Sequence, residues 1–226
     1  MDDDVARALH LLLGHGGVKK DEKAGFALLK PLAENGHARA QTLLAACFDN
    51  GTGVDKDERQ AVTWYRKAAE QGLAQAQFNL GLCFDNGTGV DKDERQAVAW
   101  YRKAAEQGDA DAQCNLGLCF ERGDGVDKDE KQAVMWYRKA AEQGHAVAQC
   151  NLGLCLQYGR GVGKDEKQAQ EWFRKAAEKG EPAAMITLAQ APTTTNGEAL
   201  ELLESAAASS ASAAICLGSA HMLGLA

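Results

Sequence analysis

The chain has 226 residues, of which 45% are hydrophobic and 25% are charged, and its formal net charge at pH 7 is −7. Lys and Arg are interspersed with Asp and Glu instead of forming a basic block, which argues against a nucleic-acid partner or an anionic membrane surface. No stretch approaches the roughly 20 apolar residues that a transmembrane helix needs, so membrane insertion is not expected.

Residues 1–36 are predicted to form a divergent N-terminal repeat that caps the array. Three aspartates open the chain, and the apolar run that follows is too short and its start too acidic for a signal peptide. A cytoplasmic location is therefore expected. Pro31 falls inside the predicted second helix, where proline costs about 3 kcal/mol, so we expect that helix to be bent or broken.

Four further units of equal length are predicted at 37–72, 73–108, 109–144 and 145–180. Their tryptophans recur every 36 residues, at Trp64, Trp100, Trp136 and Trp172. A fixed period in this range indicates a solenoid in which each unit buries its apolar stripe against its neighbours. The predicted fold is all-α, a right-handed superhelical α-solenoid of helix-turn-helix repeats that forms a single domain.

The unit 73–108 shows how each repeat is expected to fold. Apolar residues at helical spacing predict a first helix over 73–86, ended by Gly87. Asp93 suits the N-cap of the second helix, and Gln96 completes a pair that resembles a capping box. The second helix is expected to bury Trp100 between repeats.

The repeat pattern decays from residue 181, and 181–226 is predicted to hold a degenerate repeat and a final half-repeat. A short first helix over 183–191 ends before Pro192, and a second helix follows over 198–208. A last helix within 209–226 has no predicted partner. Its apolar stripe has no predicted cover. A structural array that self-associates through this C-terminal end is therefore an alternative function.

The repeated motif resembles the Sel-one-like repeat family, which is related to the tetratricopeptide repeat. In one unit it reads Ala74-Gln75-Ala76, Leu80-Gly81, Gly87-Thr88-Gly89-Val90, Trp100-Tyr101-Arg102-Lys103-Ala104-Ala105 and Gly108. The resemblance implies a non-enzymatic scaffold or adaptor that binds another protein or peptide. It also implies that the first helices line a concave binding face.

Helical geometry places one stripe of each first helix on that face. Asn side chains there can donate to and accept from an extended peptide backbone, and Leu side chains can contact its apolar groups. The alternative is that these asparagines bond neighbouring repeats and bind nothing. The predicted ligand-binding residues are Gln75, Asn79, Leu82, Asn115, Leu118, Arg122, Asn151, Leu154 and Tyr158.

The seven cysteines are an odd number, and none has CxxC spacing, so a zinc site is not predicted. We expect them to be reduced and buried as small apolar side chains. Some cysteine-rich members of the resembled family are secreted and are described as binding or hydrolysing β-lactams. Their cysteine pattern at the end of the second helix is absent here, which disfavours that alternative.

No other motif points to catalysis, a cofactor or a metal. The five histidines are scattered and include no HxxxH or HExxH pair. The loop 85–94 does not match the residue spacing of an EF-hand, so a calcium site is not predicted. Its Gly-Thr-Gly follows a helix and lacks the later glycine of a nucleotide-binding loop, so a nucleotide site is not predicted either. The serines show no GxSxG elbow. The chain is therefore predicted to be no enzyme and to need no cofactor.

Overall fold

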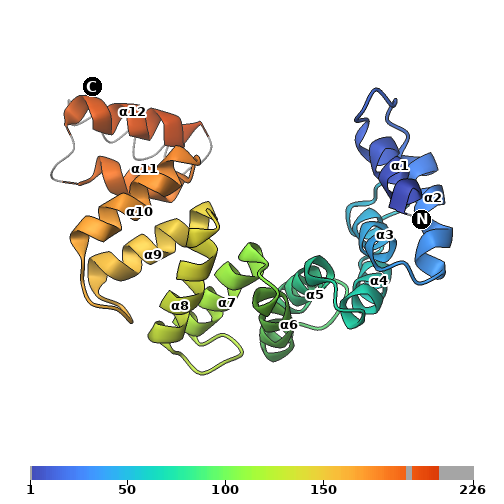
Figure 1. The fold of residues 1–226 in the computed structure, drawn as a ribbon, viewed down its shortest axis with the longest axis horizontal. Coiled ribbons are helices and arrows are strands. Elements are labelled where there is room, and N and C mark those ends of the chain that lie inside the picture. The colour runs from blue at the N-terminus through green and yellow to red at the C-terminus, as the bar shows by residue number, and fades with distance from the viewer. Residues whose placement is uncertain (1, 192–194, 209–226) are drawn as a thin grey trace. The chain divides into compact units, whose positions relative to one another are not determined.

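The computed structural model describes residues 2–191 and 195–208. Every regular element in these ranges is an α-helix, which confirms the predicted all-α class, and successive helices pair as hairpins (Figure 1). The predicted last helix within 209–226 lies outside the described residues. The helices are α1 (Asp2–Leu13), α2 (Glu22–Glu34), α3 (Ala38–Asn50), α4 (Glu58–Glu70), α5 (Ala74–Asn86), α6 (Glu94–Glu106), α7 (Ala110–Arg122), α8 (Glu130–Glu142), α9 (Ala146–Tyr158), α10 (Glu166–Glu178), α11 (Pro182–Ala189) and α12 (Asn196–Ala207).

The chain divides into two compact units, which are described separately below. The first comprises Met1–Ala112 with Asp124–Asp127, and the second comprises Gln113–Gly123 with Lys128–Ala226. Odd-numbered helices are the first helices of their repeats, and even-numbered helices are the second helices.

Aspartate caps start the second helices, as predicted. The Asp93 carboxylate accepts a hydrogen bond from the Gln96 backbone N–H at 3.0 Å, which satisfies one of the unpaired donors of the first turn. The Gln96 side chain, however, donates from Nε2 to Asp93 Oδ2 at 3.1 Å, so it bonds the carboxylate and not the N-cap backbone. A capping box in the full sense forms at Thr195 and Glu198.

Glycines allow close approach at two kinds of position, one between the two helices of a repeat and one between consecutive repeats. A Cβ at Gly81 would lie 2.7 Å from the ring of Tyr101, so α5 can sit directly on that buried aromatic. Gly89, with a φ of 68°, lies against the backbone carbonyl of Glu58 in the preceding repeat. Any side chain at Gly89 would collide with that carbonyl, and the positive φ also favours glycine.

Buried glutamines join α3 and α5 to the second helices on either side. In the first unit, Gln41 donates from Nε2 to the Ala33 carbonyl at 3.0 Å, and its Oε1 accepts from Gln71 Nε2 at 2.7 Å. Gln77 makes the same pair of bonds to Ala69 and Gln107. We call this arrangement the glutamine clamp. It satisfies buried backbone and side-chain groups at the junction between repeats.

The clamp is incomplete at the end of the second unit. Gln149 Nε2 donates to the Ala141 carbonyl at 3.1 Å, but its buried Oε1 has no hydrogen-bond partner. In the earlier repeats the donor comes from Gln71, Gln107 or Gln143. The equivalent residue beside Gln149 is Lys179.

Of the two outcomes expected at Pro31, a broken helix is wrong, because α2 continues from Glu22 to Glu34, and a bend stays a prediction. Pro31 and Ala27 are both exposed, so the Ala27 carbonyl that loses a helical donor faces solvent and water can satisfy it. The Pro31 carbonyl itself is paired, because it accepts a hydrogen bond from the Asn35 N–H at 3.0 Å.

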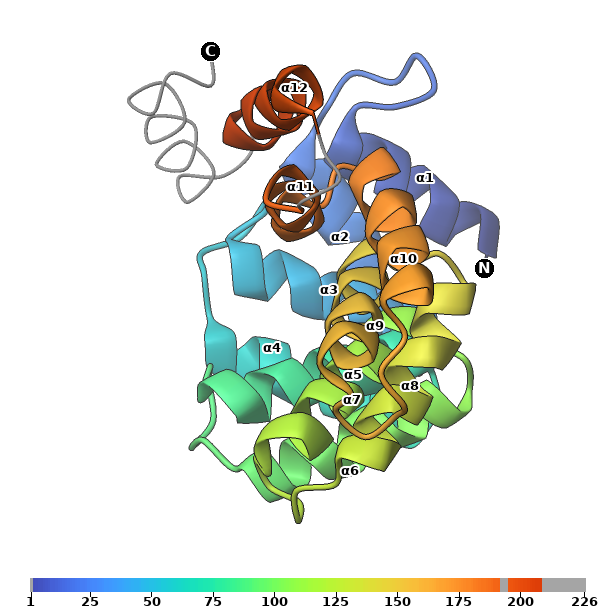
Figure 2. The ribbon, with the colours of Figure 1, turned by 90° about the vertical axis from the view of Figure 1, so that its left-hand side faces the viewer.

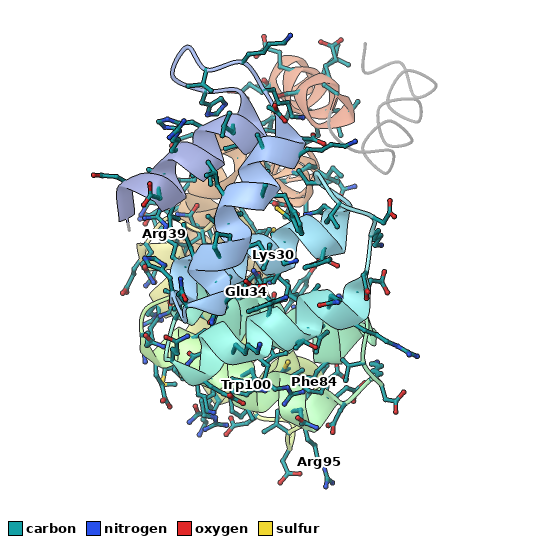
Figure 3. All side chains as sticks on the ribbon, turned by 90° about the vertical axis from the view of Figure 1, so that its right-hand side faces the viewer. Lys30, Glu34, Arg39, Phe84, Arg95 and Trp100 are labelled. Carbon is teal, nitrogen blue, oxygen red and sulfur yellow. The ribbon has the colours of Figure 1, made fainter. Side chains whose placement is uncertain are left out.

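The expectation of a buried Trp100 is also wrong, because the side chain is only partly buried (Figure 3). Lys103, one turn later on α6, covers the ring with Nζ 3.8 Å from the ring centroid. Tyr101, which is 0% exposed, fills the core instead. Among the four tryptophans only Trp136 is buried, at 6% exposure, so the tyrosine column and not the tryptophan column forms the centre of the packing.

Candidate functional site

In the first unit the predicted binding residues lie on α5. Gln75 is exposed, and Asn79 and Leu82 are partly buried. Gln75 Nε2 lies 3.4 Å from Asn79 Oδ1, and the Asn79 side chain lies near the Tyr65 hydroxyl of the preceding repeat. Asn79 therefore lies at the junction between two repeats, and both interpretations of the asparagines stay predictions.

In the second unit the predicted residues lie on α7 and α9. Asn115, Leu118, Asn151 and Leu154 are partly buried, and Arg122 is exposed. Tyr158 is 65% exposed, which is the largest exposure among the large hydrophobic side chains that the structure describes. The Arg160 guanidinium lies 5.6 Å from the Tyr158 ring centroid and holds the ring from one side.

The structure brings Leu154 and Tyr158 together at a cavity of about 900 Å³ between α9, α10 and α11. We call this cavity the α9–α11 groove. Figure 2 shows the three helices that enclose it. Its lining residues are Leu154, Gln157 and Tyr158 of α9, Glu166, Lys167, Ala169, Gln170, Glu171 and Arg174 of α10, and Thr187, Gln190 and Ala191 in and after α11.

Residues of α10 and α11 in this groove were not predicted from the sequence as binding residues. One signal was available, because Gln170 stands in the column that holds valine at 62, 98 and 134. A polar residue in a column of buried apolar residues indicates that the packing changes there.

A tyrosine–carboxylate pair, found at Tyr101 with Asp85 and at Tyr137 with Glu121, is a second feature that the sequence analysis missed. The Tyr137 hydroxyl donates to Glu121 Oε2 at 2.7 Å, and burial together with that carboxylate raises the pKa of Tyr137. Arg160 Nη1 also donates to Glu121, at 2.8 Å. In the next repeat both partners change together, to Phe173 and Gln157.

Buried cysteines are unsuited to nucleophilic chemistry. Burial raises the pKa of the free thiols Cys83 and Cys150 to about 12, and it raises the pKa of Cys47 and Cys155 to about 11. Because the thiolate is the reactive form, these side chains are almost entirely unreactive near pH 7. Cys114 and Cys119 are equally buried, and Cys216 lies outside the described residues.

Within residues 2–191 and 195–208, no cluster of His, Cys, Asp or Glu has the composition to hold a metal ion. In the same ranges, no helix combines the length and apolar character needed to cross a membrane.

Tandem helix hairpins of constant length, joined by glutamine clamps and close glycine contacts, define an α-helical repeat protein. The chain belongs to the Sel1 repeat family, which confirms the resemblance noted from its motifs. The family's model, described as the Sel1 repeat, matches five consecutive segments, at 5–37, 38–73, 74–109, 110–145 and 146–181.

Solved structures of this family are similar to the chain. A Sel1 repeat protein from Oxalobacter formigenes is 34% identical, with a TM-score of 0.83 over 91% of this chain and 84% of that one. The protective antigen c5321 of uropathogenic Escherichia coli is 32% identical, with a TM-score of 0.81 over 92% of this chain and 45% of that one. The immunity protein Pa5087 from Pseudomonas aeruginosa, at 21% identity and a TM-score of 0.57 over 88% of this chain and 74% of that one, shares the fold. No curated protein sequence matches significantly.

Proposed function

We propose that this protein is a non-enzymatic adaptor that binds another protein or peptide through the accessible side of its first helices. Sel1 repeats generally bind proteins. The observation that carries the proposal is the exposed Tyr158 beside the α9–α11 groove, since an exposed aromatic next to a cavity of about 900 Å³ is typical of a binding surface.

The side chains that support this role differ between the two units. In the second unit, the Asn115 and Asn151 amides can pair with a peptide backbone, and Leu118 and Leu154 can contact its apolar side chains. In the first unit, Asn79 lies near the Tyr65 hydroxyl of the preceding repeat, so Gln75 and Leu82 are the better candidates. Arg122 and Tyr158 add a cation and an aromatic ring at the ends of α7 and α9.

Affinity capture followed by mass spectrometry tests the proposal. Wild-type protein and the double variant Asn115→Ala/Asn151→Ala are used as baits, and the affinity of each recovered partner is then measured with purified components. Arg95→Ala is the matched control, because Arg95 projects into solvent from α6 (Figure 3).

The proposal predicts a partner that binds wild type and the Arg95→Ala control equally and the double variant more weakly. Each lost backbone contact contributes about 1 kcal/mol, so the double variant should bind about tenfold or more weakly. Equal binding of a purified partner to all three proteins would contradict the role of the first helices.

A further inference from the structure

Four Asn-Gly pairs stand in this chain, at 35–36, 50–51, 86–87 and 196–197. In such a pair the glycine nitrogen can attack the asparagine side chain, because glycine has no Cβ to obstruct the approach. Asparagine counts among the thermolabile residues for this kind of reaction. The side chain of Asn196 lies outside the described part of the structure, so only the other three pairs, all in the first compact unit, can be compared.

Asn50 and Asn86 are held in an unreactive geometry at the ends of α3 and α5. Each is the last residue of its helix, and the N–H of the following glycine donates to a helix carbonyl, at Cys47 and at Cys83. The N–H of the next threonine donates to the same carbonyl at 2.9 Å in both loops. The Asn50 amide is also occupied, because its Nδ2 donates to the Ala46 carbonyl at 3.0 Å. The glycine nitrogen can therefore reach the asparagine Cγ only after this helix end opens.

Asn35 lies in a more open turn, between α2 and α3. It is the C-cap of α2, with a φ of −78° and a ψ of 8°, and both Asn35 and Gly36 are exposed. An added Cβ at Gly36 would meet nothing within 4 Å, whereas one at Gly51 or Gly87 would lie 3.4 Å from a lysine of its loop. Pro31 removes one hydrogen bond from the last turns of α2, which lowers the free energy needed to open this helix end.

The glutamine clamp is missing at this turn. The residue equivalent to Asn35 in the next two repeats is Gln71 or Gln107, which donates to the clamp glutamine 30 positions earlier. The residue 30 positions before Asn35 is Val5, which offers no side-chain acceptor. Within residues 2–191 and 195–208 the Asn35 amide makes no hydrogen bond, so no such contact holds its Cγ away from the Gly36 nitrogen.

We propose that Asn35 is a site of spontaneous deamidation in the folded protein. The Gly36 nitrogen bonds to Asn35 Cγ while the Cγ–Nδ2 bond breaks, and the NH2 group leaves as ammonia with the Gly36 amide proton. Solvent water then opens the cyclic imide at either carbonyl and is the only other reactant. The products are aspartate at position 35 and isoaspartate, in which the main chain runs through Cβ and Cγ.

The modified turn lies at the first junction between repeats. His37 follows directly, with its Nδ1 accepting the Ala40 N–H at 3.3 Å, and Gln41 donates to the Ala33 carbonyl at 3.0 Å. Isoaspartate lengthens the main chain between these contacts. Either product also adds a negative charge at the C-terminus of α2, where the helix dipole disfavours it. Deamidation is therefore expected to loosen the capping repeat, residues 1–36, from the repeat that follows.

Peptide mapping by mass spectrometry tests the proposal. The folded protein is aged at neutral pH in heavy-oxygen water and digested in ordinary water, so that only carboxyl groups formed during ageing carry the label. We expect the Asn35 amide to be lost at least about fivefold faster than the Asn50 or Asn86 amide, because the fold protects those two more strongly. In urea the three rates should become equal, since the same dipeptide then reacts without protection.

Two variants connect the modification to its consequence. Asn35→Gln should abolish deamidation at this position, because glutamine cyclises far more slowly. After ageing, this variant should keep the hydrogen-exchange protection of α2 and α3 that wild type loses. Asn50→Gln is the matched control and should age as wild type does.

The ageing of wild type decides the proposal without any variant. Loss at Asn50 or Asn86 that equals or exceeds the loss at Asn35 in the folded protein would overturn it. An Asn35 that stays intact in the folded protein and reacts only in urea would do the same. A difference between the sites that persists unchanged in urea would overturn it too, because neighbouring sequence and not the fold would then set the rates.

Discussion

Replacing Lys179 by glutamine should stabilise the protein, because it completes the one glutamine clamp, among the described residues, that lacks its donor. Gln149 Oε1 is buried and unpaired, and Gln149 is 3% exposed. The equivalent acceptors receive a glutamine Nε2 at 2.7 Å from Gln107 and at 2.8 Å from Gln143. Lys179 is the C-cap residue of α10, as those glutamines are of their helices.

Two effects of the substitution oppose each other. Supplying a donor to a buried acceptor should contribute about 1–3 kcal/mol. Removing a cation from the C-terminus of α10 should cost about 0.3–1 kcal/mol, and the exposed position of Lys179 puts the cost at the low end. The gain from the hydrogen bond exceeds the loss of the charge, so we expect a net stabilisation of about 1 kcal/mol, or about 2–4 °C in Tm.

Thermal and urea unfolding measure the gain, and native-state hydrogen exchange around α9 and α10 locates it. Lys179→Met is the matched control, because it removes the charge but offers no donor, and it should be neutral or slightly destabilising. Gln143→Lys makes the reverse change one repeat earlier and should destabilise. Equal stabilities of Lys179→Gln and Lys179→Met would refute the reasoning.

Burial determines the expected outcome of three further experiments. Trp136→Ala should destabilise by about 3–5 kcal/mol, and more than Trp100→Ala, because only Trp136 is buried; urea unfolding compares the two. The seven cysteines should titrate as nearly all free when the protein is denatured without reductant, and two or more disulfides would favour secretion instead. Nitrocefin hydrolysis should be absent, since Cys83 and Cys150 are protonated at neutral pH; activity that survives rigorous purification would contradict this.

The fold could be predicted from the sequence because it depends on local patterns that recur. Apolar spacing, aspartate caps and terminal glycines define each helix by itself, and their fixed period defines the array. The Trp100 prediction failed because hydrophobic character does not show that Lys103 can cover one side of the ring. The continuity of α2 through Pro31 was missed because the sequence does not show that the carbonyl losing its donor faces solvent.

The candidate site could be predicted only in part. Leu154 and Tyr158 were found from helical geometry, because they share one face of one helix. The rest of the α9–α11 groove comes from α10 and α11, and the spacing of residues along α9 cannot identify it. Tyr65, whose hydroxyl lies near Asn79, is likewise on another helix, and single-helix geometry cannot identify it.

The short reach of the glutamine clamp has a consequence for how this gene can change. Each clamp joins a glutamine only to residues 8 and 30 positions away, so no bond of this kind spans more than one junction. Residues 51–72 and 87–108 differ only at Thr63 and Ala99. Unequal recombination between these two segments would delete or duplicate one whole repeat, and the new junction would be built from the same residues as the old one.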